Sequence, residues 1–424
     1  MNFKTLAIIA LFTVFLYNML LKLIRYRSAE NPVPPNVVDV YDRDTYKKWR
    51  AYHAEKCRLG MLESAAGFAV DVLLILLNAY ALFAGLFADT PFMQMFAVML
   101  LSALTAVAAL PFSYYDTMVI EEKYGFNRST GKTFWLDQLK SFLIGLALMT
   151  LIGALLLWIH QALGDWLILV FAAVMTLLML GLTFLYPVFS RIFNKFTPLE
   201  DGELKEKLTG LLEKHGYRVR AIQIMDASRR STKSNAYFSG FGKMKTIVLF
   251  DTLVQAMTPD EICAVFAHEM GHGLHKDTLK YQILTFVQML VLGVMAWLTL
   301  RSAEVFVPFG FTGVNYGFAI VLIMSVEFAL IAPLFGLLTN AVSRRAEYRA
   351  DAQAVAEGYA DALISALKKL ARENFSELAP SPLLVKLEYS HPTLSQRIAA
   401  IEKRKAENTA KKEETKEQDS SSEE

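Results

Sequence analysis

Two histidines and a glutamate occur within five residues in the stretch "HEMGH" (268–272). Positions four apart lie on one face of an α-helix, so His268 and His272 can offer imidazole nitrogens to a single metal ion. Glu269 is offset from that face. At this offset its carboxylate would not bind the ion but would reach a water molecule bound to it. Two nitrogen ligands, an open position and a carboxylate base are typical of a zinc-hydrolase centre, with one Zn²⁺ per chain.

A catalytic zinc needs a third protein ligand. In a metzincin, a glycine would lie three residues after the second histidine and a third histidine three residues beyond that. This chain has His275 and Thr278 at those positions, so the metzincin class of metalloproteases is excluded. His275 stays near the same face and could compete as a ligand, although a place beside the site or on the surface suits it better. Glu347 and Asp351 lie four apart in "NAVSRRAEYRADAQA" (340–354). One of these carboxylates could bind zinc while the other accepts the free N–H of a zinc-bound histidine. The same pattern also fits an ordinary helix with Arg–Glu pairs.

The helix that carries the histidines has a well-marked start. Thr258 suits the N-cap, Pro259 the first helical position, and Glu261 completes a capping box. Upstream, "DGELKEKLTGLLEKHGY" predicts an amphipathic helix that ends at Gly216. Short strands are predicted at residues 220–226, 235–240 and 245–251.

The composition indicates a membrane protein, because 54% of the residues are hydrophobic and only 20% are charged. About 20 apolar residues are needed for a helix to cross a bilayer. We expect about seven such helices, and we interpret the first as an uncleaved anchor because basic residues, not a cleavage site, follow it. The apolar runs lie near residues 5–24, 62–88, 92–112, 141–160, 165–188, 282–300 and 317–339.

The basic residues predict the orientation of these helices. The connection after the first run carries eight Lys and Arg residues between positions 25 and 58, and the connection after the third carries four. The long segment after the fifth run is also rich in them, whereas the connections after the second and fourth have none and the one after the sixth has only Arg301. Positive charge favours the cytoplasmic side, so we expect the N-terminus outside and the C-terminus in the cytoplasm.

The predicted fold is mainly α, a polytopic membrane protein combined with a cytoplasmic α+β metalloprotease domain. Helical patterns also cover about 341–372 and 393–406, and the charged tail is expected to be disordered. The predicted parts are membrane helices 1–5 with their loops (1–188), the α+β segment with HExxH (189–280), membrane helices 6–7 (281–340), a cytoplasmic helical segment that completes the zinc site (341–408) and the tail (409–424).

Other classes of partner and site are excluded by charge and by cysteine content. The net charge of +2 gives no basic surface for nucleic acid. Cys57 and Cys263 lie far apart without a CxxC pattern, which argues against a disulfide framework or a thiolate zinc site. The expected partners are a peptide or protein substrate and the lipid bilayer, and we expect a monomer.

Several stretches together resemble the CAAX prenyl endopeptidase family, type I, which are membrane-embedded gluzincin zinc proteases with seven spanning helices. They span most of the chain in the family's order and are far more specific than HExxH alone. They are "PFSYYDTMVIEEKYGFNRST" (111–130), "PVFSRIFNKFTPL" (187–199), "SNAYFSGFGKMKTIVLFDTL" (234–253), "HEMGH" (268–272), "NAVSRRAEYRAD" (340–351) and "YSHPTLSQRI" (389–398).

The resemblance implies a role for each matching residue. It implies a water-filled chamber enclosed by the seven helices, with the zinc at its cytoplasmic end. Glu347 matches the third zinc ligand, Asp351 the acid that orients a zinc histidine, and Glu269 the general base. His391 matches a histidine that contacts the substrate near the metal, and a donor there would stabilise the oxyanion. The substrate-binding residues are then Asn235, Ala236 and Tyr237 on a strand edge, with Arg397 in the C-terminal block.

The expected reaction is hydrolysis of a peptide bond. In the family, substrates include C-terminal CAAX peptides with a prenylated cysteine, and a prenyl chain needs apolar surroundings. An alternative is quality control of membrane proteins in a bacterium. The short connection after "FDTL" favours the bacterial inner membrane slightly over the endoplasmic reticulum. In a different class, a zinc-binding transporter would show repeated halves, which we do not find. A zinc scaffold would prefer four closed ligands, usually including cysteine.

Overall fold

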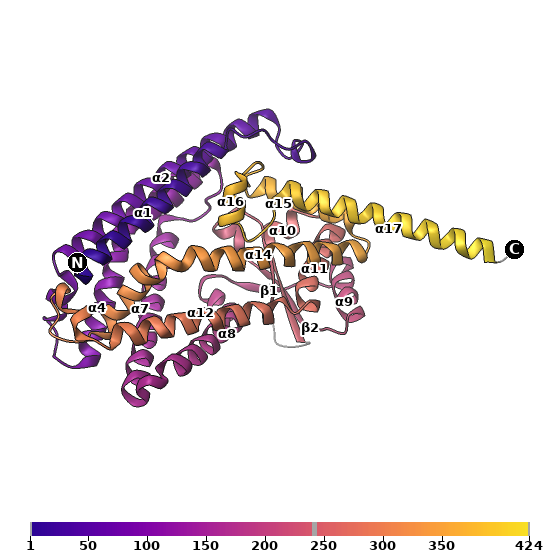
Figure 1. Cartoon of the computed structure of the whole chain (residues 1–424). Helices are drawn as coiled ribbons and strands as arrows, with labels where there is room; N and C mark the ends of the chain where they lie inside the picture. Colours follow the sequence, from indigo (N-terminus) through magenta and orange to yellow (C-terminus); the bar gives the residue numbers. More distant parts are fainter. Residues whose placement is uncertain (1, 240–243, 423–424) are drawn as a thin grey trace. The chain divides into compact units, whose positions relative to one another are not determined.

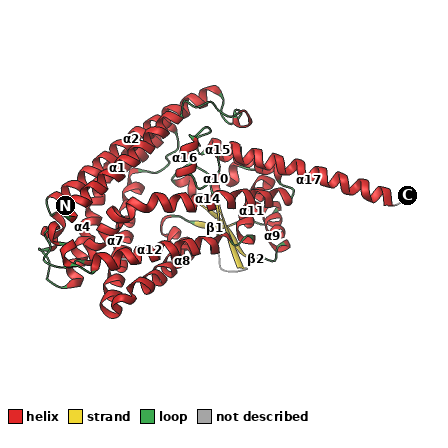
Figure 2. Ribbon diagram, in the orientation of Figure 1, coloured by secondary structure: helices red, strands yellow, loops and turns green. Residues whose placement is uncertain are grey.

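The structure is a computed structural model that describes residues 2–239 and 244–422 (Figure 1). Helices dominate it, and the strands are confined to one small sheet (Figure 2). The chain divides into two compact units, each assembled from segments that are far apart in the sequence. The first comprises Met1–Arg27, Tyr52–Thr183 and Tyr281–Leu337, and the second comprises Ser28–Ala51, Phe184–Lys280 and Leu338–Glu424.

The first unit is built from long apolar helices, some of which continue into the segments of the second unit. Its helices are α1 (Phe3–Ser28), α2 (Arg43–Leu76), α3 (Ala79–Ala84), α4 (Pro91–Thr105), α5 (Leu110–Tyr115), α6 (Glu122–Tyr124), α7 (Gly131–Leu163), α8 (Leu167–Phe193), α12 (Asp277–Leu300), α13 (Tyr316–Val321) and α14 (Phe328–Ala356). Two π-helical stretches, Asp116–Glu121 and Leu322–Glu327, interrupt this regular pattern.

The described residues contain six helical segments that are long and apolar enough to cross a membrane. One of them, Gly131–Leu182, contains the predicted apolar run 141–160 and most of the run 165–188. Its two helices, α7 and α8, are separated by the short 3₁₀ turn Gly164–Trp166, where Gly164 has a φ of 53°. Glycine adopts that left-handed conformation without a steric cost. The polytopic helical class is therefore confirmed, and six segments are found where about seven were predicted because two runs fall in one segment.

The core of the first unit forms where α4, α7 and α13 pack closely. A Cβ atom on Gly317 would lie 2.6 Å from the carbonyl oxygen of Met95, and one on Gly153 would lie 2.8 Å from the Met95 Sδ. The buried Phe318 packs against Phe309, with the ring centroids 4.8 Å apart and the rings tilted by 59°. Glycines thus allow the helices to approach, and aromatic rings fill the space beside them.

The second unit combines a four-stranded sheet with helices. The sheet has the order β1-β2-β4-β3, in which β2 and β4 are parallel and the other neighbours are antiparallel. The three predicted strands are present with shifted ends, and β1 was not predicted. The elements are β1 (Phe196–Pro198), α9 (Glu203–Lys214), β2 (Arg218–Met225), β3 (Ala236–Ser239), β4 (Met244–Phe250), α10 (Asp251–Ala256), α11 (Pro259–Leu274), α15 (Ala360–Glu373), α16 (Pro382–Leu387) and α17 (Leu394–Ser422).

Helix α11 lies in the core of the second unit. Its apolar face buries Ile262, Cys263 and Phe266 completely or almost completely. Leu208 of α9 and Leu363 of α15 belong to the same apolar cluster. Each large apolar side chain contributes roughly 1.5–3 kcal/mol when fully buried, so this face fixes the rotation of α11 and hence the direction of its polar residues.

Two predictions about the C-terminal region differ from the structure. The helical pattern predicted over about 341–372 is split, because Gly358 adopts a φ of 90° between α14 and α15. The tail predicted to be disordered (409–424) continues α17 as a helix to Ser422. The residues 409–418 are mainly Ala, Lys, Glu and Gln, which all have high helix propensity, and a helix can form from them without a packed core.

A close approach between α11 and α14 sets the spacing of the polar residues on both helices. A Cβ atom added to Gly271 would lie 2.8 Å from the Ala350 Cα and 3.1 Å from the Gln353 Cβ. The first of these neighbours is backbone, so it can move aside only if the whole helix shifts. Glycine at position 271 therefore lets the two helices touch.

We predict that Gly271→Ala destabilises the protein by about 1–3 kcal/mol, because overpacking forces the two helices apart. The matched control is Gly210→Ala in α9, where a Cβ atom would meet nothing within 4 Å. That change should leave stability unchanged or raise it slightly, since alanine favours a helix over glycine. Thermal unfolding of the purified proteins checks both, and equal melting temperatures for Gly271→Ala and the natural chain would contradict the prediction.

Candidate metal centre

The N-terminus of α11 is anchored by the predicted capping box. The Thr258 hydroxyl accepts a hydrogen bond from the Glu261 backbone N–H at 3.3 Å, and the Glu261 carboxylate accepts one from the Thr258 N–H at 2.8 Å. Glu261 also accepts from Lys369 at 2.7 Å and from the Ser365 hydroxyl at 2.6 Å, both on α15. Although burial alone would raise it, the pKa of Glu261 is lowered by these donors. The helix that carries the histidines is thus held at its first turn.

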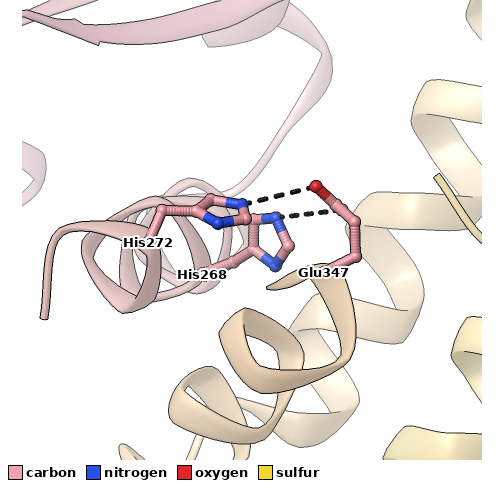
Figure 3. Close-up of side chains that lie close together, drawn as sticks. All are labelled: His268, His272 and Glu347. Carbon is pink, nitrogen blue, oxygen red and sulfur yellow. Dashed lines mark ion pairs between the residues drawn. The ribbon is translucent and has the colours of Figure 1, made fainter. Parts of the chain in front are cut away.

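The structure brings together the three residues expected to hold a metal. One ligand atom from each of His268, His272 and Glu347 lies within 4.8 Å of the others. The His268 Nε2 is 3.5 Å from one Glu347 oxygen, and the His272 Nε2 is 3.4 Å from the other. Both imidazoles of α11 point toward the carboxylate on α14 (Figure 3). Residues that are 75 positions apart in the sequence, His272 and Glu347, therefore face one another.

This arrangement fits a divalent metal ion. The Glu347 side chain is only 6% exposed, and among the described residues its Oε2 atom has no hydrogen-bond partner. A buried carboxylate oxygen that accepts no hydrogen bond is unfavourable unless a cation lies close to it. Two imidazole nitrogens and one carboxylate oxygen form the donor set of many catalytic metal sites, and they leave a coordination position open.

Asp351 fixes the orientation of the first histidine. Its Oδ1 lies 2.8 Å from the His268 Nδ1, and its side chain is 2% exposed. Because a carboxylate can only accept, we assign the proton to Nδ1, which leaves the Nε2 lone pair directed at the centre. The arrangement is the one in which an acid sets the tautomer of a metal histidine.

The second histidine is surrounded by negative charge. Burial alone would lower the pKa of His272, but the Glu347 carboxylate, assisted by Asp277 and Glu269, raises it to about 9. The centre therefore attracts a positive charge to the position between the ligands. A metal ion that binds there must displace the proton, so binding releases protons.

Arg397, predicted to bind substrate, has other neighbours in the structure. Its side chain is 12% exposed and donates to both oxygens of Asp351, at 3.0 Å from Nε and 2.6 Å from Nη2. Its Nη1 lies 3.4 Å from Glu347. Burial alone would lower the pKa of Arg397, but the Asp351 and Glu347 carboxylates raise it. We therefore interpret the guanidinium as a counter-charge for these carboxylates, and its contact with substrate stays a prediction.

His391 lies at the exposed side of the centre. Its Nε2 is 3.3 Å from the Glu347 Oε1, while its side chain is 61% exposed. The preceding segment is tied to α14, where Arg344 donates to the Tyr389 carbonyl at 2.6 Å and Asn340 to the Leu387 carbonyl at 3.1 Å. His391 is thus both near the ligands and accessible from outside.

The expected substrate strand forms an edge of the sheet. Strand β3 pairs with β4 and is the last strand in the order β1-β2-β4-β3. Asn235 is exposed, and Ala236 and Tyr237 are half-buried. An edge strand presents backbone N–H and C=O groups that can pair with another extended chain.

Sequence reasoning missed one acidic residue of this centre. Asp277 lies 3.2 Å from the His272 Nδ1 through its Oδ2 atom, and the residue is 1% exposed. Only one orienting acid was predicted for the two histidines. The need for a second acceptor, for the Nδ1 proton of His272, is the signal that points to the aspartate five residues later. His275, the competing ligand candidate, is instead an exposed C-cap residue of α11 outside the three-residue cluster.

Comparisons with known proteins agree with this geometry. Residues 4–195 match the family model described as CAAX prenyl protease N-terminal, five membrane helices, and residues 198–405 match the model for peptidase family M48. The chain is 32% identical over 413 residues to CAAX prenyl protease 1 of Saccharomyces cerevisiae, which covers 89% of this chain and 90% of that one. It is 36% identical to a CAAX prenyl protease 1 homolog of Arabidopsis thaliana, with 87% of this chain and 90% of that one covered. A crystal structure of S. mikatae Ste24p superposes with a TM-score of 0.87 at 30% identity, covering 95% of this chain and 99% of that one.

Proposed function

The chain belongs to peptidase family M48 and is a multi-pass membrane metalloendopeptidase, and from that premise we propose that it is a zinc-dependent protease of the CAAX type. The observation that carries the proposal is the cluster of His268, His272 and Glu347, of which His268 and Glu347 are buried. Because the chain belongs to a peptidase family, a protease is favoured over the two alternative functions, a zinc-binding transporter and a zinc scaffold.

We propose that one Zn²⁺ ion is held by His268, His272 and Glu347. A set of two imidazoles and one carboxylate suits zinc, whose catalytic sites commonly have three protein ligands. Zinc bound there would act as a Lewis acid that activates water and polarises the peptide carbonyl. Asp351 and Arg397 would keep the first histidine in the orientation that its hydrogen bond already shows.

Side chains around the ligands would carry out proton transfer and stabilise the oxyanion. Glu269 would accept a proton from the attacking water and deliver it to the leaving amide nitrogen. It sits half-buried on α11, between the two histidines in the sequence. His391 would donate a hydrogen bond to the oxyanion, since its ring is beside Glu347 and open to the substrate side.

We propose that the substrate peptide binds as an additional strand on β3. Main-chain hydrogen bonds to Asn235, Ala236 and Tyr237 would hold it extended, which presents the scissile bond without reading its side chains. Side-chain selectivity must then come from elsewhere, and a prenyl group is one way to supply it. A lipid-bearing cysteine would explain why a peptidase is built into membrane helices, because the prenyl chain partitions into apolar surroundings.

We propose that the N-terminus lies outside and the C-terminus in the cytoplasm. The support is the charge of the connections, because Lys and Arg concentrate after the odd-numbered apolar runs.

The bacterial inner membrane remains a prediction that rests on the short 254–257 connection alone, and the relatives named above come from eukaryotes. We propose a monomer.

The base is tested by Glu269→Gln. The variant keeps the three ligands, so its zinc content should equal that of the natural chain, while kcat/KM should fall by about 10²–10⁴-fold. Zinc is measured by mass spectrometry of the purified protein and cleavage by peptide release. Glu373→Gln, an exposed position on α15, is the control that should cleave normally. Normal cleavage by Glu269→Gln would refute the assignment.

The lipid preference is tested with two peptides of the same sequence, one prenylated at the CAAX cysteine and one not. We expect release of the last three residues from the prenylated peptide at a higher kcat/KM, because the lipid contributes binding energy. Mass spectrometry of the products identifies the cleaved bond. Equal processing of both peptides would remove the lipid argument and favour the alternative, a protease that acts broadly on membrane proteins.

The orientation is tested by single cysteines placed on a background without Cys57 and Cys263. Asp89→Cys lies in the connection after the second apolar run and Lys411→Cys lies in the tail. A membrane-impermeant maleimide added to intact cells or right-side-out vesicles should label position 89 and reach position 411 only after permeabilisation. The reverse pattern would show the opposite orientation.

A further inference from the structure

The two histidines of the centre have different acids behind them. Asp351 lies behind His268 on α14, four residues after Glu347. Asp277 lies behind His272, 3.2 Å from its Nδ1, on the first residue of α12. In both cases the contact uses the Nδ1 atom, so that the Nε2 atoms are the ones that face Glu347.

Asp277 reaches this position through an unusual turn. Helix α11 ends at Leu274, and Lys276 adopts a left-handed conformation with a φ of 53° before α12 begins. A residue other than glycine loses roughly 1 kcal/mol in that conformation. Such strained positions persist where surrounding contacts require them. Here the turn directs Asp277 back toward the last turn of α11.

Two cations hold the Asp277 carboxylate in place, and both bind the same oxygen. The Lys280 Nζ lies 2.9 Å from Oδ1, and the Arg349 Nη2 lies 2.7 Å from it. The other oxygen, Oδ2, is the one that faces His272. Arg349 stands two residues after Glu347 on α14, so Asp277 connects the His272 ring to the helix that carries Glu347.

An ordinary aspartate at a helix start would interact with the backbone N–H groups of its own helix. Among the described residues, Asp277 instead has side chains as hydrogen-bond partners: His272, Lys280 and Arg349. Its burial, with 1% of the residue exposed, also sets it apart from a solvated helix start. The ion pairs balance its charge and leave one oxygen for the imidazole.

We propose that Asp277 is a positioning residue of the metal centre, which holds the His272 ring in the tautomer and rotation that direct Nε2 at the metal. This inference rests on the proposed function, because it assumes that His272 binds a metal. Acids behind metal histidines are worth about 10–100-fold in metal affinity. The loss of Asp277 should therefore weaken metal binding without removing a ligand.

The test compares zinc affinity in Asp277→Ala, Asp277→Asn and the natural full-length chain, each purified in detergent and stripped of metal. Competition with a chromophoric zinc chelator gives the Kd, and circular dichroism shows that the metal-free proteins are folded. We expect a Kd about 10–100-fold weaker for Asp277→Ala. For Asp277→Asn we expect a smaller loss, because the amide oxygen can still accept from Nδ1. The matched control is Asp361→Ala, which removes an exposed aspartate that pairs with Lys405 at 2.7 Å and should bind zinc normally.

A purely structural role would lower the melting temperature of the metal-free protein and leave the Kd of the folded protein unchanged, and that result would overturn the proposal. If Asp277→Ala does not fold, the isosteric Asp277→Asn decides: a Kd equal to that of the natural chain overturns the proposal, and a weaker one supports it. His268→Ala separates this inference from the proposed function. Normal zinc affinity in His268→Ala would refute the metal site itself, whereas loss of zinc there with normal affinity in the Asp277 variants would refute the positioning role alone.

Discussion

The buried carboxylate of Glu347 is the constraint on which the rest of the second unit depends. It faces two imidazoles, is nearly inaccessible to solvent, and has one oxygen without a hydrogen-bond partner among the described residues. Leaving such a group unneutralised would cost several kcal/mol. The Arg397 guanidinium lies 3.4 Å from that oxygen, and the metal ion that we propose would add a second cation there. The close contact at Gly271 brings α11 near enough for both histidines to face the same carboxylate.

The surrounding charges follow from the same constraint. Three carboxylates in a small volume would repel one another and would favour protonation, which would spoil them as ligands and acceptors. Each outer acid is therefore paired with an arginine: Asp351 with Arg397 and Asp277 with Arg349. Arginine suits this use because it stays charged when it is buried and its planar head can bind two oxygens. The net charge around the ligands is thereby kept low enough that a proton or a metal ion can balance it.

The sequence predicted the local features of the centre well and the contacts between distant segments only in part. Spacing alone placed His268 and His272 on one face, and the Thr258–Glu261 capping box is formed as expected. Residues alone left Glu347 and Asp351 interchangeable, since both lie on one helix face. The family resemblance assigned Glu347 as the ligand and Asp351 as the orienting acid. Glu347 groups with the two histidines, and Asp351 contacts the Nδ1 atom of His268. Asp277 was not predicted, because its position depends on a left-handed turn at Lys276. A lysine does not indicate such a turn in the sequence, as a glycine would. The helical tail was missed because its composition suits a helix and a disordered chain equally.

Of the two helices that carry the candidate ligands, α14 is continuous with an apolar segment long enough to span a membrane, and α11 is followed by another such segment, α12, after the short turn at Lys276. Helix α14 runs without a break from Phe328 to Ala356 and bears Glu347, and Asp277 is the first residue of the candidate span Asp277–Leu300. Along the chain, the candidate ligands on α11 and α14 are joined only through those segments. The centre is therefore not a module attached to a membrane anchor. The 75 positions from His272 to Glu347 include the candidate span Asp277–Leu300 and the start of the candidate span Tyr316–Ala356, so the candidate centre cannot be cut out of the sequence as one uninterrupted segment without them.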